Sequence, residues 1–392
     1  MLLFDTPPSA DTGPARHGEP HYDYLCRTGR PPFLRVRELI ESWVAEFPRA
    51  HRKEITVRLR SRHNHHFEAA FFELYIHALF RRLGYVVRIH PRAGSRNKRP
   101  DFLIAKGERP GLLVEALSVT EGSDASRAQE SRLNAVYDAL NRVHCPDYFL
   151  RLEYYGELTS PLPGERLRRE LRKFLDGLDY EAVRNLAKDG SRYLPKCVFI
   201  HDSFRLELGV IPVSPQRRGH PEHRPLGVHG PGDGAWVDHH TPLKDRIGYK
   251  AHHYGQLRRP LVLAINAAGG HADSIDVMQA LFGTERWIFS TDSGEPREAG
   301  FVRASDGALI GPRGPQNRNV SAILIISALL PWTVATSEPV VYHNPWARYP
   351  TTHLPESLTQ IRLDGQQMVS SEGSAANELL ALPKGWPHFD RL

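Results

Sequence analysis

The stretch over residues 67–119 constrains the fold most, because one strong helix signal is followed at once by three short strand-like runs. In FEAAFFELYIHALFRRLGY, apolar side chains recur at helical spacing and Gly84 marks the end of the helix. The apolar stripe consists of Phe72, Ile76, Leu79 and Leu83. The runs VVRIH, DFLIA and GLLVEALSV then have the length and apolar character of strands. This order predicts a layered α/β fold.

Three acidic residues stand out in this stretch. Glu73 lies on the helix, Asp101 follows Pro100 at the start of the second run, and Glu115 interrupts the third run. An isolated carboxylate buried in such a strand costs several kcal/mol unless it is paired or binds a metal. Converging carboxylates are hard oxygen ligands of the kind that Mg²⁺ prefers. The pattern therefore indicates a site for Mg²⁺ or Mn²⁺, which would activate water against a phosphodiester.

The segments FFELYIHALFRRLGY, RPDF and VEA together resemble the PD-(D/E)XK nuclease superfamily, which has the restriction-endonuclease fold. Glu73 lies eleven residues before Gly84, and Glu115 lies fourteen residues after Asp101. The resemblance covers residues 67–119 and beyond them only the order of elements. It implies a core of helix, three strands, helix and strand. It also implies that Glu73, Asp101 and Glu115 are metal ligands, joined by the backbone carbonyl of Ala116.

The sequence departs from the superfamily at the motif lysine, because the position two residues after Glu115 is Leu117. Side chains two apart in a strand share a face, so the expected lysine would point the same way as the glutamate. The chain has only nine lysines. Lys98, in the loop before Asp101, and Lys250 are the two candidates for a catalytic lysine at this site. Lys250 is favoured, because family members can carry the lysine on a neighbouring helix.

The placement of Lys250 depends on where the core ends. In one assignment the strand LVLAIN is the fourth core strand, and residues 120–240 are a large insertion. In the other, a helix over 126–143 and the strand YFLRLEYYG close the core, and Lys250 belongs to a second α/β region. The sequence does not choose between these assignments.

We therefore expect an α/β protein with either a large insertion or a second α/β region. The expected regions are a mobile N-terminal tail over 1–32, a nuclease-like core over 33–156, a helical connector over 157–195, a second α/β region over 196–345 that could complete the core, and a loop-rich C-terminal tail over 346–392.

A basic loop, PRAGSRNKR, directly precedes Pro100 and Asp101. Its cationic residues are candidates for contacts with nucleic-acid phosphates, and they are Arg92, Arg96, Lys98 and Arg99. The formal charge of the chain is +6, with arginine far in excess of lysine. Arginine binds phosphate through two donors, so this excess agrees with a nucleic-acid partner.

Other function classes find less support in the sequence. The three cysteines are scattered, which argues against a disulfide framework or a thiolate zinc site and favours a reducing cytoplasm. Adjacent histidine pairs, such as His65-His66 and His252-His253, lack the spacing of zinc motifs. No apolar run is long enough to span a bilayer, so no membrane association is expected.

These observations predict a cytoplasmic, metal-dependent nuclease that hydrolyses DNA, with a role in bacterial defence or repair by analogy with its fold. Two alternatives stay open. One is a nucleic-acid-binding protein with a silent site, which Leu117 favours. The other is a regulatory or assembly protein that forms a homodimer or docks a partner protein through residues 120–345.

Overall fold

The computed structural model describes residues 2–5, 7, 9–119, 124–188, 194–219, 225–231, 240–267, 274–292, 295–351, 353–365 and 367–389. The chain forms two compact units. The main unit consists of residues 1–14, 20–121 and 238–392. The inserted unit consists of residues 15–19 and 122–237.

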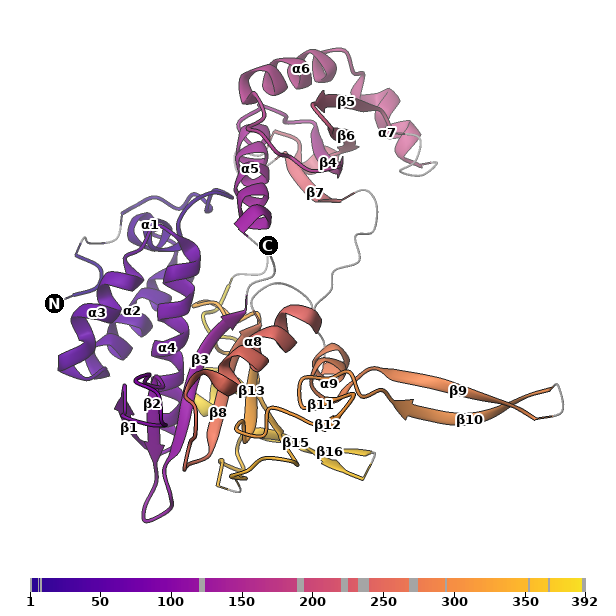
Figure 1. The fold of residues 1–392 in the computed structure, drawn as a ribbon. Helices are drawn as coiled ribbons and strands as arrows, with labels where there is room; N and C mark the ends of the chain where they lie inside the picture. The colour runs from indigo at the N-terminus through magenta and orange to yellow at the C-terminus, as the bar shows by residue number, and fades with distance from the viewer. Residues whose placement is uncertain are drawn as a thin grey trace. The chain divides into compact units, whose positions relative to one another are not determined.

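The main unit is built on a mixed sheet whose described strands run in the order β1-β2-β3-β8-β13-β14-β15-β16 (Figure 1). The strands are β1 (Val86–Ile89), β2 (Phe102–Ala105), β3 (Leu112–Val119), β8 (Leu261–Ala267), β13 (Ala322–Ser327), β14 (Pro339–His343), β15 (Thr359–Asp364) and β16 (Gln367–Ser371). The pairs β3–β8, β8–β13 and β14–β15 are parallel, and the other neighbours are antiparallel. The α/β class predicted from the sequence is therefore confirmed.

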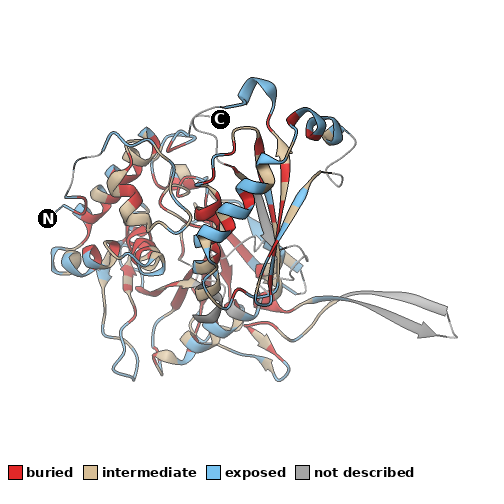
Figure 2. Cartoon of the chain, turned by 90° about the horizontal axis from the view of Figure 1, so that it is seen from above, coloured by how far each residue is buried: buried red, intermediate tan, exposed pale blue. Residues whose placement is uncertain are grey.

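Helices cover both faces of this sheet, because its central strands are apolar on both sides. The helices of the main unit are α1 (His21–Arg27), α2 (Pro31–Glu46), α3 (Arg49–Leu59), α4 (Asn64–Arg82), α8 (His240–His253), α9 (Ser274–Phe282) and α10 (Ala376–Leu379). On β8, Val262 and Ala264 pack with α2 to α4, whereas Leu261, Leu263 and Ile265 pack with α8 and α9. A strand buried on both faces reads as a continuous apolar run, as LVLAI does. Figure 2 shows buried residues in red at the centre of the main unit.

Two small hairpins accompany the main sheet. One pairs β9 (Glu285–Asp292) with β10 (Glu295–Arg303), and the other pairs β11 (Ile310–Gly311) with β12 (Gly314–Pro315). Both follow α9 in the chain and precede β13. Each hairpin forms a separate two-stranded sheet, and among the described residues neither pairs with a strand of the main sheet.

The inserted unit has its own sheet and its own core. Its described strands run in the order β5-β6-β4-β7. They are β4 (Tyr148–Tyr155), β5 (Lys196–His201), β6 (Phe204–Pro212) and β7 (Leu226–Pro231), with helices α5 (Asp124–Leu140), α6 (Gly164–Asp176) and α7 (Tyr180–Lys188) and the short 3₁₀ helix η2 (Pro215–Arg217). Leu150 and Leu206 of this sheet pack with Leu140 and Leu171 of the helices in one apolar cluster. This separate core explains why the unit forms a compact body within the chain.

The structure decides between the two assignments of the core. Strand β8, which is the run LVLAIN, pairs in parallel with β3, so the chain returns to the main sheet after the insertion. The helix and strand predicted over residues 126–155 are α5 and β4 of the inserted unit. The predicted boundaries at residues 156, 195 and 345 are therefore corrected to boundaries near 121 and 238. A return to a distant strand leaves no local signal in the sequence, which is why the pattern did not reveal it.

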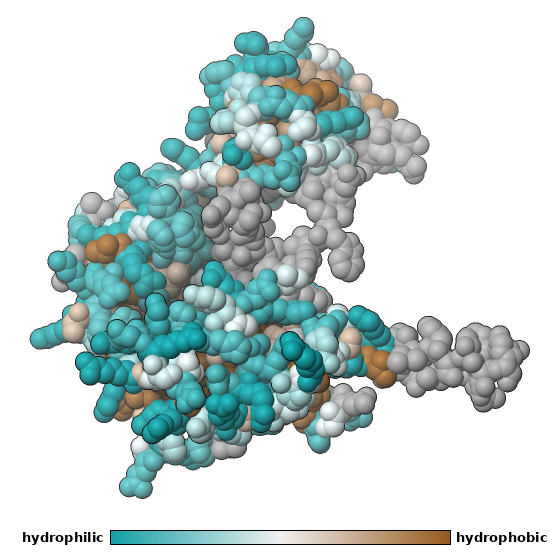
Figure 3. Space-filling view, in the orientation of Figure 1, coloured by the Kyte–Doolittle hydropathy of each residue, from teal (hydrophilic) through white to brown (hydrophobic). Residues whose placement is uncertain are grey.

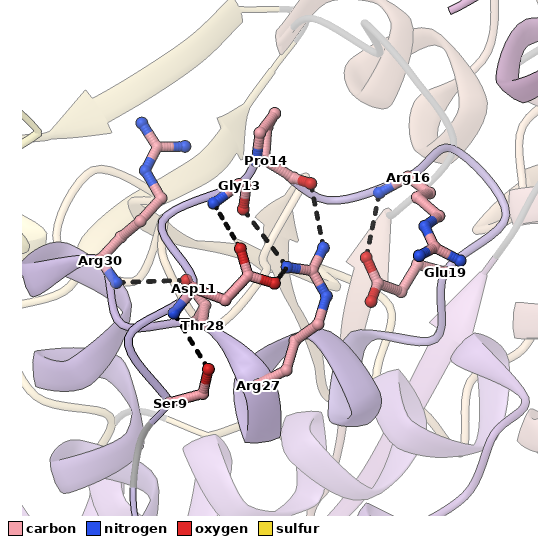
Figure 4. Close-up of polar contacts among 9 residues, drawn as sticks. All are labelled: Ser9, Asp11, Gly13, Pro14, Arg16, Glu19, Arg27, Thr28 and Arg30. Atoms are coloured by element: carbon pink, nitrogen blue, oxygen red, sulfur yellow. Dashed lines mark hydrogen bonds and ion pairs between the residues drawn. The ribbon is translucent and has the colours of Figure 1, made fainter. Parts of the chain in front are cut away.

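The N-terminal segment is not the mobile tail that the sequence predicted. Leu3 is fully buried, and α1 packs against α4. The Arg27 guanidinium donates hydrogen bonds to the Asp11 carboxylate at 2.6 Å and to the Pro14 carbonyl at 3.0 Å (Figure 4). These contacts tie an irregular, polar segment to α1. The sequence of this segment has no periodic pattern, because the segment is held by contacts with α1 and not by a regular repeat of its own.

The C-terminal region also differs from the predicted tail. Although loops fill much of residues 346–392, β15 and β16 extend the main sheet and α10 follows them.

Much of the surface of the main unit seen in Figure 3 is hydrophilic. None of the helices in the described ranges is long and apolar enough to cross a membrane.

The basic loop over residues 91–99 packs closely against the C-terminal end of α8. The amides of Ser95 and Arg96 donate to the Tyr254 carbonyl, and the Gln256 amide donates to the Ser95 hydroxyl at 3.0 Å. Gly94 has a φ of +76°, and a Cβ there would lie 2.2 Å from the Tyr254 carbonyl oxygen. The approach therefore requires glycine at this position.

We expect Gly94→Ala to lower the free energy of unfolding more than Gly107→Ala. Gly107 also has a positive φ, +60°, but a Cβ there meets no atom within 4 Å. Gly107→Ala should cost only the left-handed backbone penalty, about 1–2 kcal/mol, whereas Gly94→Ala adds a clash with backbone. Urea denaturation measures both, and equal losses would contradict the close approach.

Candidate active site

The two predicted strand carboxylates meet where β2 and β3 stop pairing. The pairing of β2 with β3 ends at Phe102 and Val114. Beyond this pair, backbone groups of β3 on the side of β2 can form hydrogen bonds with side chains. The Ala116 amide donates to Asp101 Oδ2 at 2.8 Å, and the Asp101 amide donates to Glu115 Oε2 at 3.2 Å. The diverging strands thus place Asp101 and Glu115 side by side.

Lys250 reaches this pair from α8. Its Nζ lies 2.5 Å from Glu115 Oε1, and the exposed fractions of the two side chains are 17% and 6%. Tyr254, which directly follows the end of α8, is buried beside them, and burial together with the Glu115 carboxylate raises its pKa. The predicted proximity of Lys250 to the carboxylates is confirmed.

Leu117, two residues after Glu115 on β3, packs against α8. Leu117 is 8% exposed and packs in the apolar cluster that includes Ile247 and Ala251 of α8. Glu115 points to the same face of β3, because side chains alternate along a strand. Lys250 on the covering helix therefore approaches Glu115 from the face of β3 that Leu117 also occupies.

The surroundings of Asp101 raise the pKa of its carboxyl group. Burial and, to a smaller extent, the Glu115 and Glu73 carboxylates raise the pKa of Asp101 to about 8. The Ala116 amide and Lys250 act in the opposite direction but do not compensate. Among the described residues no cation forms an ion pair with Asp101, so a bound cation is the group that would stabilise its charged form.

Glu73, the third predicted metal ligand, is paired with an arginine of α3. Its two carboxylate oxygens each accept a hydrogen bond of 2.7 Å from the Arg58 guanidinium. Although burial lowers the pKa of Arg58, its contact with Glu73 and the nearby Asp101 and Glu54 raise that pKa overall. As a metal ligand, Glu73 would have to share or release this arginine. Arg58 lies within a basic stretch of the sequence, but nothing in that stretch distinguishes it from its neighbours.

The basic loop lies near α8 but does not supply a lysine to the carboxylates. Arg92, Arg96, Lys98 and Arg99 are all exposed, and the Arg96 guanidinium donates to the His252 carbonyl at 3.0 Å. The contacts of Lys98 within the described structure do not include Asp101 or Glu115. Of the two candidate lysines, only Lys250 is therefore brought to the site.

The donor set fits a hard divalent cation. Asp101 and Glu115 are adjacent carboxylates, of which Glu115 is buried and Asp101 half-buried, and Asp101 lacks a cationic partner among the described residues. Mg²⁺ uses one or two carboxylates together with waters and substrate phosphates. Comparison of the chain with protein-family models, curated proteins and solved structures gave no match.

We expect Asp101→Asn to stabilise the metal-free protein at neutral and higher pH. The unfolded carboxyl group titrates near pH 3.8 and the folded group near pH 8, so between these values the unfolded state releases the proton first. The stability contributed by Asp101 thus falls as the pH rises through this window. Asparagine does not titrate and keeps an oxygen for the Ala116 amide. Every kcal/mol gained should raise the Tm by about 2–4 °C.

Thermal unfolding in EDTA, from about pH 4 to about pH 8, measures this difference. The gain of Asp101→Asn over the wild type should grow across the window. Asp245→Asn, which changes an exposed carboxylate on α8, is the matched control and should show no such growth. A gain that is independent of pH would contradict the account of Asp101.

The ion pair between Lys250 and Glu115 predicts strong coupling between the two side chains. Lys250→Met leaves Glu115 buried without a cation and should cost about 3 kcal/mol of unfolding free energy. In the double variant with Glu115→Gln, the loss should be clearly smaller than the sum of the single losses. Lys244→Met, on the same helix, controls for removing a lysine. Additive losses in chemical denaturation would argue against the pair.

Proposed function

We propose that this chain is a metal-dependent nuclease that hydrolyses phosphodiester bonds of DNA. The observation that carries the proposal is the contact of 2.5 Å between Lys250 and Glu115, directly beside Asp101. The two adjacent carboxylates would bind a metal cation, and the neighbouring lysine would stabilise the negative charge of a phosphate group. That combination is the functional core that the resemblance to the PD-(D/E)XK superfamily implies.

The order of the elements supports the same proposal. Helix α4, strands β1 to β3, helix α8 and strand β8 follow one another as helix, three strands, helix and strand, once the inserted unit is set aside. In this reading α8 is the second core helix, and it carries the lysine that Leu117 replaces in the strand. The insertion between β3 and α8 then separates the two halves of the site in the sequence.

The side chains have distinct roles in this proposal. Asp101 and Glu115, with the Ala116 carbonyl, would hold Mg²⁺ or Mn²⁺, which supplies an activated water and neutralises phosphate charge. Lys250 would orient the water or stabilise the charge that develops on the phosphate. The exposed arginines of the basic loop would hold the nucleic-acid backbone.

A second candidate function is nucleic-acid binding without catalysis. It is favoured by the internal pairing of the carboxylates, since Arg58 holds Glu73 and Lys250 holds Glu115. A site that is balanced by its own cations attracts a metal less strongly. The basic loop would then carry the function through phosphate contacts alone.

Cleavage of plasmid and single-stranded DNA in the presence of Mg²⁺, Mn²⁺ or EDTA distinguishes the two candidates. We expect cleavage that depends on the metal and falls by about 100-fold or more in Asp101→Asn and Lys250→Met, because each change removes charge stabilisation. Lys244→Met is the control on the same helix and should cleave at the wild-type rate.

No cleavage with either metal, or cleavage that Asp101→Asn leaves unchanged, would contradict the nuclease. Salt-sensitive DNA binding without cleavage would instead favour the binding protein. In that case Arg92→Ala and Arg99→Ala should weaken binding, whereas Asp101→Asn should not.

A further inference from the structure

A second group of potential metal ligands lies outside the carboxylate pair. His51 and Glu54 belong to α3, and His90 follows β1. One ligand atom from each of the three side chains lies within 4.8 Å of the other two. Nothing in the sequence indicated this group, because His90 lies 36 residues after Glu54 and the three residues match no zinc motif.

The backbone holds the three side chains in place. His51 and Glu54 are three residues apart on α3 and therefore share one face of the helix. His90 has a φ of +48°, and its amide donates to the Asp101 carbonyl at 2.8 Å. The rings of His51 and His90 approach edge to face, with centroids 5.3 Å apart. The arrangement thus joins a helix to the end of a strand that neighbours the carboxylate site.

The chemistry of the group differs from that of Asp101 and Glu115. Two imidazoles and one carboxylate form a donor set that suits Zn²⁺ and similar transition-metal ions, whereas Mg²⁺ prefers oxygen ligands alone. Three protein ligands leave a tetrahedral ion with one open position, as in catalytic zinc sites. His51 and His90 are half-buried and Glu54 is exposed, so an ion can enter from solvent.

The residues around the group indicate which kind of ligand the open position would bind. His51, Glu54 and His90 line a cavity whose wall also includes Arg58, Glu73 and Asp101. A phosphate oxygen or a water at the open position would share this cavity with the Arg58 guanidinium. Although the Arg58 guanidinium already donates to Glu73, its positive charge in the same cavity wall favours an anionic ligand.

The geometry points to a transition-metal site formed by His51, Glu54 and His90, which binds Zn²⁺ or an ion of that class and offers one position to water or a phosphate oxygen. The site does not rest on the proposed nuclease function. It would join α3 to the end of β1 and thereby stabilise the region around Asp101 as well as bind a ligand.

Another cluster of histidines provides the competing explanation for any metal binding. The rings of His63, His65 and His66 lie with centroids 4.1–5.7 Å apart near the start of α4. An experiment must therefore separate the two clusters. His65→Gln combined with His66→Gln removes the second cluster and leaves the first intact.

The test is titration of the full chain, made without a polyhistidine tag and stripped with EDTA, with Co²⁺ followed by its visible absorption. The wild type should bind Co²⁺ with a visible d–d band that Zn²⁺ abolishes. His51→Ala and His90→Asn should each weaken binding by about tenfold or more. Asparagine tolerates the positive φ of His90, so this variant preserves the backbone.

Two variants must retain the band. Asp101→Asn tests whether the ion occupies the carboxylate pair, and the double change at His65 and His66 tests the competing cluster. An absent band, a band unchanged in both His51→Ala and His90→Asn, or a band lost in Asp101→Asn or in the double variant would overturn the site.

Discussion

The buried ion pair between Glu115 and Lys250 is the constraint on which the main unit depends. A carboxylate that is 6% exposed on a central strand needs a partner, because an uncompensated charge there costs several kcal/mol. The partner comes from α8, more than a hundred residues later in the chain. The pair therefore requires α8 to cover β3 at the height of Asp101, and the basic loop to pack against the end of α8.

The insertion is compatible with this constraint because it has a core of its own. The chain leaves the main sheet after β3, forms the inserted unit and returns through α8 to β8, which pairs with β3. Among the described residues, each apolar cluster is made of side chains from one unit alone. A large segment can therefore stand between the carboxylates and their lysine without disturbing the pairing of β3 and β8.

Local patterns in the sequence predicted the elements well but not their long-range partners. The apolar stripe of α4 and the apolar runs of β1 to β3 can be recognised in the sequence because each is a pattern among residues only a few positions apart. The sequence makes Lys250 a candidate for the catalytic lysine because lysines are scarce and position 117 is a leucine. Its contact with Glu115 is seen only in the structure. The pairing of Arg58 with Glu73 had no such signal, since one arginine among many carries no information about its partner.

The same reasoning explains the errors at the ends of the chain. Residues 1–32 lack periodicity, but Leu3 is buried and Arg27 fixes the Asp11 segment through hydrogen bonds. Residues 346–392 contain short strands that gain stability from the edge of an existing sheet. Both segments depend on tertiary contacts, which composition does not reveal.

Moving the lysine from α8 to β3 tests whether α8 supplies the lysine of this site. The account predicts that Lys250→Met abolishes metal-dependent DNA cleavage and that adding Leu117→Lys restores part of it, because positions 117 and 115 share one face of β3. Circular dichroism establishes that both variants are folded. Full cleavage by Lys250→Met alone, or no recovery in the folded double variant, would contradict the claim that α8 supplies the lysine of this site.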